Sequence, residues 1–333
     1  MRAIALTCLF TSFLIFSAEE RVNHEGRTLP PPPEIKAPIL FNTPEADAVV
    51  SAMQIFPKDN AWNEDISKRP VHPDSEKIIA LIGPAKKLAC NSDMGYVIVP
   101  PNQPKIDVKL VDYGNESDAG PYPLPDNAPI EDWPTNGKTL DDIQRNGRGD
   151  RHVVVVDPVN AKLYEFYTGR KTDAGWQAAC EATFDLNSNA LRPKGWTSTD
   201  AAGLPIFPAI VRYDECERGM VEHALRFTVR KSKREYIYPA THFAPNSKDP
   251  NACAMGQRFR LKADVDIESF PKHAKAIALA LKKYGMIMAD NGGDWRLSIA
   301  PDKRITGLEA LGKLKGSDFE VIQTTGEHEA PRK

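Results

Sequence analysis

The chain has 333 residues, of which 41% are hydrophobic and 26% charged, and its formal net charge is -2. These values are typical of a globular protein, and the length permits one or two domains with a substantial core. Nucleic-acid binding needs a basic surface, so the nearly neutral charge argues against a nucleic-acid partner.

The first eighteen residues have the layout of a secretory signal. Arg2 supplies a short positive region, residues 3–16 are uncharged and mostly apolar, and a Ser-Ala pair then offers a cleavage site. The apolar stretch is short for a membrane-spanning helix, which needs about 20 residues. An uncleaved anchor is the alternative, because Phe16 lies at the third position before the cut, where a small residue is preferred. We therefore predict a signal peptide over residues 1–18, a protein that is secreted or held in the periplasm or cell envelope, and no further transmembrane segment.

The segment after the signal is predicted to be extended. Residues 19–42 contain a run of four prolines, which favours polyproline geometry, so we expect a proline-rich tether. Order is expected to begin at Thr43, which suits the N-cap of a helix that has Pro44 at its first position. A second short helix is predicted over residues 75–82, where a Gly-Pro pair ends it.

The middle of the chain favours strands. Residues 96–99 and 106–110 have strand patterns, and the second alternates apolar and polar residues. Residues 113–150 are rich in proline and acids and lack periodicity, which indicates an ordered surface excursion. The clearest hairpin runs over residues 151–167, because Pro158 suits the first corner of its turn.

The remaining elements complete one domain. A long helix is predicted over residues 271–284, a strand over 295–299 and a short helix over 308–314, followed by a polar tail over 324–333. Because no repeat or linker interrupts the chain after the tether, residues 43–323 are predicted to form a single globular domain. Hairpins with interspersed helices predict an α+β fold with an antiparallel sheet or sandwich at its core and several flanking helices.

The cysteines predict disulfides. Cys8 would leave with the signal peptide, and the remaining four are an even number in an oxidising compartment. We expect two disulfides, with three connectivities open, and free buried thiols are the alternative. The four residues are Cys90, Cys180, Cys216 and Cys253.

A second hairpin is predicted from residues 221–229 and 235–242. If its strands pair so that their apolar residues share one face, His223 lies directly opposite His242. Two imidazoles about 5 Å apart could bind a divalent metal or transfer protons. His152 is the candidate for a third partner in this histidine cluster. The alternative is a pair of core histidines bonded to backbone groups or to each other.

The segment over residues 184–205 gathers polar side chains around a tryptophan. The ring of Trp196 could stack on the apolar face of a sugar. Asn189, Arg192 and Asp200 could hydrogen-bond the hydroxyls of that sugar, so these four residues are the predicted substrate-binding site. The alternative is an ordered loop whose polar groups satisfy its own backbone.

Carboxylates next to apolar residues are the candidates for acid-base chemistry. We expect raised pKa values for Glu165, Asp185, Glu222 and Asp290. A glycosidase needs two such groups at a fixed separation. Asp185, together with the two histidines of the second hairpin, is predicted to be catalytic.

Several stretches resemble an uncharacterised family of secreted bacterial proteins. The stretches that carry the resemblance include YGNESDAGPYPLP, FDLNSNALRPKGWTSTDAAGLPIFP and KKYGMIMADNG. Similar proteins occur in polysaccharide-rich environments, and some are fused to carbohydrate-binding modules. The resemblance implies one exported domain and an association with glycans, and it implies no catalytic residue.

These observations predict a secreted glycan-active enzyme, a hydrolase or lyase that acts on an extracellular polysaccharide. The alternative is a non-catalytic extracellular protein that binds carbohydrate or belongs to the cell envelope.

Overall fold

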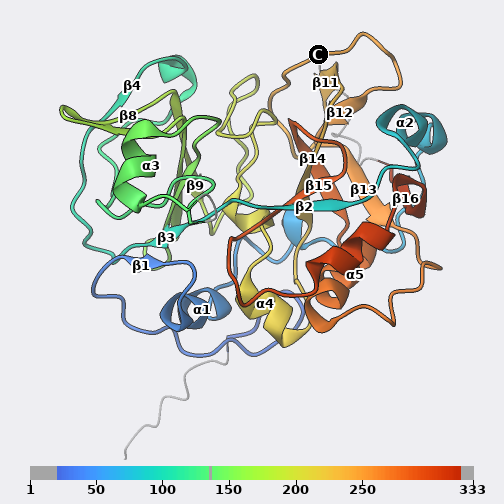
Figure 1. Cartoon of the computed structure of the whole chain (residues 1–333), viewed down its shortest axis with the longest axis horizontal. Coiled ribbons are helices and arrows are strands. Elements are labelled where there is room, and N and C mark those ends of the chain that lie inside the picture. The colour runs from blue at the N-terminus through green and yellow to red at the C-terminus, as the bar shows by residue number, and fades with distance from the viewer. Residues whose placement is uncertain (1–20, 135–136, 324–333) are drawn as a thin grey trace, which may run out of the picture.

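The computed structural model describes residues 21–134 and 137–323. These residues form two larger sheets, two smaller sheets and five α-helices (Figure 1). The α+β class is confirmed, although the sheets are mixed and contain parallel pairs as well as antiparallel ones. The predicted signal peptide and polar tail lie outside the described residues.

The five-stranded sheet contains the predicted first hairpin. In spatial order its strands are β1 (Ile39–Leu40), β3 (Val97–Ile98), β5 (Val153–Asp157), β6 (Lys162–Tyr167) and β9 (Cys180–Asp185). β5 and β6 pair antiparallel with Val153 opposite Phe166, which confirms the hairpin. The valines of β5 alternate between two hydrophobic cores, so this strand is buried on both faces.

The six-stranded sheet forms the other half of the molecule. In spatial order its strands are β16 (Phe319–Val321), β13 (Arg258–Leu261), β14 (Met286–Asn291), β10 (Leu225–Val229), β15 (Arg296–Ile299) and β2 (Ala89–Ser92). β10 lies between β14, to which it is parallel, and β15, to which it is antiparallel. The apolar side chains of this sheet belong to the same core as those on one face of the five-stranded sheet, so this larger core joins the two halves.

Two smaller sheets complete the strands, and one of them corrects a prediction. β4 (Val108–Leu110), β8 (Gly175–Ala178) and β7 (Arg170–Thr172) cover the smaller core, while β11 (Ser232–Tyr236) pairs with β12 (Cys253–Met255). β10 and β11 follow each other in the chain but belong to different sheets, so the predicted second hairpin is wrong. Both edges of β10 are occupied by strands from far along the chain, which leaves β11 no edge to pair with.

The first predicted helix begins at its predicted N-cap. Thr43 Oγ1 accepts a hydrogen bond of 3.2 Å from the amide of Ala46, as the predicted N-cap requires. One helix in the proline-rich excursion was not predicted, and the last predicted helix is a 3₁₀ turn over Leu308–Lys313. The α-helices are α1 (Pro44–Ser51), α2 (Ser75–Ile82), α3 (Leu140–Asn146), α4 (Tyr213–Arg218) and α5 (Lys272–Lys283).

The described part of the predicted tether lies against the body of the protein. Leu29, Ile35 and Phe41 expose 6%, 7% and 2% of their surface, so residues 21–42 do not form a free linker. Single apolar side chains spaced along this segment are buried against the body of the protein, while the run of four prolines stays exposed.

The four cysteines outside the predicted signal are free thiols, so the predicted disulfides are absent from the described residues. Cys180, Cys216 and Cys253 are buried, as in the alternative of buried thiols. Among the described helices, none is both long enough and apolar enough to cross a bilayer.

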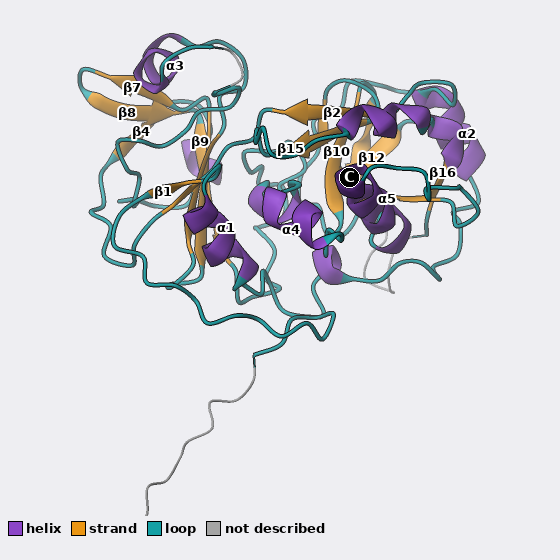
Figure 2. Ribbon diagram, turned by 60° about the horizontal axis from the view of Figure 1, so that its bottom comes forward, coloured by secondary structure: helices purple, strands orange, loops and turns teal. Residues whose placement is uncertain are grey.

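The two large sheets lie side by side, with α4 near the junction between them (Figure 2). The chain crosses between the sheets several times, because β2 belongs to one and the strands before and after it to the other. The segment between β9 and β10 lies in this junction, and it includes the polar stretch singled out in the sequence.

Candidate functional site

A cavity of about 260 Å³ receives residues from both large sheets. β6 and β9 supply part of its wall, the end of β14 supplies the facing part, and loops supply the rest. We call this cavity the cleft. Its lining residues are Tyr113, Asp150, Tyr167, Cys180, Thr197, Ser198, Thr199, Ala201, His242, Ala244, Asp290 and Asn291.

Asp290 stands where β14 leaves the core. The pairing of β14 with β10 skips Ala289, and this bulge changes the alternation of side chains just before the carboxylate. Burial, followed by the negative charge of Asp200, raises the pKa of Asp290 to about 7, although Arg226 and His152 act in the opposite direction. Asp290 therefore retains its proton up to near-neutral pH, as a general acid must.

His242 presents a free ring nitrogen to the same cavity. Its Nδ1 lies 2.7 Å from the carbonyl oxygen of Ala201, and a carbonyl can only accept, so Nδ1 carries the proton in the neutral ring. Nε2 then has a lone pair, and it has no hydrogen-bond partner within the described part of the chain. This fixed tautomer makes Nε2 able to accept a proton or to ligate a metal.

The loop over residues 197–204 forms one wall and is held by internal bonds. Ser198 Oγ donates to the carbonyl oxygens of Asp200 and Leu204, at 3.0 and 2.6 Å. Gly203 adopts a φ of +73°, and a Cβ there would lie 2.0 Å from Thr241 Oγ1, so only glycine fits. These contacts hold the cleft wall in place without a ligand.

A buried carboxylate supports this loop from β6. Glu165 is fully buried and accepts hydrogen bonds from the amides of Ile206 and Phe207 and from Thr199 Oγ1, at 2.9 to 3.1 Å. Burial raises the pKa of Glu165 to about 7, in spite of these donors. The predicted raised pKa is confirmed, but the carboxylate positions the loop and does not line the cleft.

Two buried ion pairs lie close to the cleft wall. Arg226 of β10 binds Asp200 through Nε, at 2.8 Å, and through a second guanidinium nitrogen. His152 donates from Nδ1 to Glu131 Oε2 at 2.9 Å and from Nε2 to the carbonyl of Thr199 at 2.8 Å. Although burial opposes it, Glu131 raises the pKa of His152 to about 10, so this histidine is a structural cation.

Tyr167 and Asp150 line the cleft beside each other. The Tyr167 hydroxyl lies 3.3 Å from Asp150 Oδ1, and the Asp150 side chain is exposed. Burial, followed by the charge of Asp150, raises the pKa of Tyr167 to about 12. Tyr113 also lines the cleft, and it exposes 45% of its surface.

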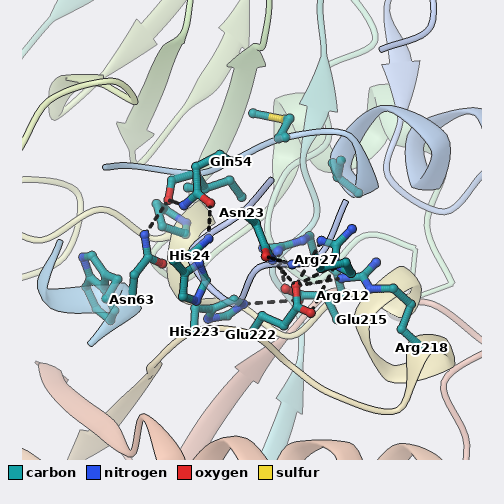
Figure 3. A pocket seen from close by; sticks show the side chains of 15 residues that line it. Asn23, His24, Arg27, Gln54, Asn63, Arg212, Glu215, Arg218, Glu222 and His223 are labelled. Carbon is teal, nitrogen blue, oxygen red and sulfur yellow. Dashed lines mark hydrogen bonds and ion pairs between the residues drawn. The ribbon is translucent and has the colours of Figure 1, made fainter. Parts of the chain in front are cut away.

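The predicted pair of histidines is not assembled. His223 lies in a separate, small polar cavity of about 30 Å³, which Figure 3 shows. Its Nε2 lies 3.2 Å from Glu215 Oε2 and its Nδ1 lies 2.8 Å from the carbonyl of Ala224, so both ring nitrogens face acceptors. His223 is thus a core histidine, as the alternative interpretation held, while His242 remains the candidate for proton transfer.

The N-terminal segment supplies part of the lining of the small cavity. In Figure 3, Asn23 and Arg27 of this segment point to Glu222, and their bonds to it measure 2.8 to 3.1 Å. Arg212 binds Glu215 at 2.6 Å in the same network. Space for about one or two water molecules remains, which excludes a sugar from this cavity in its present form.

The predicted sugar-binding residues have mainly structural roles. Arg192 is buried, and it donates to Asp118 Oδ2 at 2.6 Å and to the carbonyls of Glu116 and Thr197. Asp200 is bound to Arg226, and Trp196 is half-buried under the guanidinium of Arg192.

Asn189 and Asp185 also lie apart from the cleft. Asn189 binds Asp59 and Asn60 at 2.8 Å near the start of the chain. Asp185 is exposed, and the amide of Asn187 together with Lys162 lowers its pKa, so the prediction of a raised pKa is wrong. The segment over residues 184–205 still contributes four of the twelve cleft residues, although none of its predicted ligands is among them.

Sequence reasoning missed Tyr113, Asp150, Tyr167 and Asn291. The signal was present for Asn291, which is the last residue of a largely buried strand and follows the singled-out Asp290. No group of three histidine, cysteine or acidic residues in the described chain is arranged to hold a metal ion.

The comparisons with known proteins identify no relative. No protein-family model matches the chain, and no match is found among curated proteins or among solved structures. The function is therefore inferred from the chemistry of the cleft.

Proposed function

We propose that this protein is a secreted enzyme that hydrolyses glycosidic bonds of an extracellular polysaccharide in the cleft. One observation carries the proposal: Asp290, which retains its proton to about pH 7, and His242, whose Nε2 is free, line the same cavity. The cleft volume of about 260 Å³ is near the lower end of small-molecule sites, which begin at about 300 Å³.

The proposed reaction is a direct displacement by water. Asp290 donates its proton to the glycosidic oxygen as the bond from that oxygen to the anomeric carbon breaks. His242 Nε2 takes a proton from the water molecule whose oxygen forms the new bond to the same carbon. The cycle closes when the imidazolium releases its proton to solvent and the Asp290 carboxylate takes one up.

The walls of the cleft support binding of a sugar. Tyr113 and Tyr167 offer aromatic surface, and Asp150 and Asn291 add polar oxygens and an amide in the same cavity. Sites of this kind combine apolar or aromatic contact with a few placed polar groups. The predicted export and the resemblance to secreted proteins associated with glycans agree with this substrate class.

The exposed ring of Tyr113 would serve a protein that only binds glycans equally well. A non-catalytic carbohydrate-binding or envelope protein is therefore the second candidate. The two functions differ in turnover, so they are separated by measuring product and binding on the same samples.

The test compares Asp290→Asn, His242→Asn and a matched control, Asp74→Asn. Asp74 lies next to α2 and outside the cleft, and it undergoes the same chemical change as Asp290. Asparagine at position 242 keeps a donor for the Ala201 carbonyl but lacks the Nε2 lone pair. The assay measures release of reducing ends from a panel of neutral, cationic and anionic polysaccharides, and binding by affinity electrophoresis.

We expect the Asp290 and His242 variants to lose about 100-fold or more in turnover while they still bind. The control should behave as the wild type. Binding of a polysaccharide by the wild type with no cleavage of any member of the panel would favour the second candidate. An ultraviolet absorbance from an unsaturated product would contradict hydrolysis and identify elimination instead.

A further inference from the structure

We infer that the glycan bound in the cleft carries free amino groups, as a glucosamine polymer does. This inference rests on the proposed function for its site and deepens it by naming the charge of the substrate. Two aspartates line the cleft, and none of the twelve described lining residues is a lysine or an arginine.

Other cavities of the protein differ in this respect. Each of four others includes a cationic side chain, namely Arg27, Arg212 and Arg218 in the small polar cavity, and Lys262, Arg192 and Arg21 in three further cavities. The chain has almost as many basic residues as acidic ones, with 43 lysines and arginines against 45 aspartates and glutamates. The absence of cations from the described cleft lining is therefore a local property and does not follow from the overall composition.

The two aspartates also lack cationic partners among the described residues. Asp150 accepts a hydrogen bond from Tyr167, and Asp290 accepts one from the amide of Asn291 at 2.6 Å. Arg226 and His152 are the buried cations that act on Asp290. Two nitrogens of Arg226 are bound to Asp200, and the ring nitrogens of His152 are bound to Glu131 and to the carbonyl of Thr199. Asp290 is the protonated acid of the proposed reaction, so the negative charge left for a ligand to balance is that of Asp150.

The aromatic lining is an independent observation that favours a cationic ligand. Tyr113 and Tyr167 line the same cavity as the aspartates. An ammonium group is stabilised by tyrosine and aspartate together, because the face of a tyrosine ring attracts cations and a carboxylate accepts hydrogen bonds from the ammonium. A uronate or sulfated chain would bring like charges together, and desolvation in a concave site would increase that cost.

The experiment uses the full-length mature protein and three soluble probes: a glucosamine polymer, a neutral glucan and a polygalacturonate. Binding and cleavage of each are measured for the wild type, for Asp150→Asn and for the control Asp74→Asn. Asp150 is exposed, so its variant is expected to fold, which circular dichroism checks. Binding of the glucosamine polymer is also followed as salt is raised from about 0.05 to 0.5 M.

The wild type should bind the glucosamine polymer most tightly and the polygalacturonate least. Asp150→Asn should weaken binding of the glucosamine polymer about fivefold and reduce its salt dependence, and it should weaken binding of the neutral glucan by a smaller factor. The control should change neither.

Each other outcome has a distinct meaning. Cleavage of the neutral glucan with no preference for the glucosamine polymer would overturn this inference and leave the proposed hydrolase standing. Selective binding of the glucosamine polymer without cleavage would support the inference and contradict the proposed hydrolase. Preference for the polygalacturonate would overturn the inference outright.

Discussion

The ion pair between Asp200 and Arg226 gives a quantitative test of how the cleft is built. Asp200 exposes none of its side chain and Arg226 exposes 5%, and among the described residues the guanidinium is the carboxylate's only hydrogen-bond donor. Asp200→Asn preserves the shape but leaves a buried cation opposite an amide group. Removal of one partner from a buried pair costs about 3–5 kcal/mol, so the unfolding free energy should fall by about 4 kcal/mol.

The same substitution has a second, electrostatic consequence. Asp200 is the foremost charge that raises the pKa of Asp290, so its removal should lower that pKa from about 7. Urea unfolding measures the first effect, and carboxyl resonances followed through a pH titration measure the second. Arg226→Met combined with Asp200→Asn should cost less than the sum of the single changes, because no buried charge remains unpaired.

The exposed pair of Asp185 and Lys162 provides the stability control. Asp185→Asn should cost less than about 1 kcal/mol, because exposed ion pairs contribute little. If Asp200→Asn is as mild as this control, or if the pKa of Asp290 is unchanged in it, the account of the buried charges beside the cleft is refuted.

Three further predictions follow from the fold. The pKa of Asp290 is higher in the folded state than in the unfolded state, so Asp290 stabilises the fold below about pH 4, and this contribution is lost as pH rises through about 7. Urea unfolding at several pH values should therefore show a smaller loss of stability with rising pH for Asp290→Asn than for the wild type. Gly203→Ala should lower the unfolding free energy by about 3 kcal/mol or more, because the new Cβ clashes with Thr241. Gly219→Ala should lower it by about 1 kcal/mol, because Gly219 also has a positive φ, +90°, but has open space around it. Equal thermal unfolding temperatures for the two variants would contradict the steric explanation. Titration of the mature chain, unfolded without reductant, should detect four free thiols, and a count of none would show two disulfides instead.

Local elements were predictable because their signals are local. Thr43 and the proline after it mark the start of α1, and the turn around Pro158 marks the first hairpin; in both cases the hydrogen bonds join residues that are near in sequence. The second hairpin failed for the opposite reason. β10 has apolar residues that suit a hairpin equally well, but its partners begin at Met286 and Arg296. Alternation of side chains shows that a strand forms and does not show which strand lies beside it.

The cleft was predictable only in fragments. Asp290 was singled out from its apolar neighbours, and His242 from a hairpin pairing that does not form. Their meeting with Asp150 joins segments more than ninety residues apart in the numbering. Arg192 and Asp200 were assigned to a ligand because polar residues in a loop are usually solvated. Here they are buried and form ion pairs within the protein. No sequence pattern distinguishes a polar side chain that binds a sugar from one that hydrogen-bonds within the protein and holds a loop in place.

The interleaving of the two large sheets has a practical consequence for dissecting the protein. β2 is the edge strand of one sheet, yet it comes before β3, β5, β6 and β9, which all belong to the other. A fragment that starts after β9 would therefore lose β2 and leave an open edge on β15, where strands of other molecules could add. Cutting the gene at any single point separates a strand from its neighbours, so truncation cannot yield an intact half, and loss-of-function studies need point substitutions.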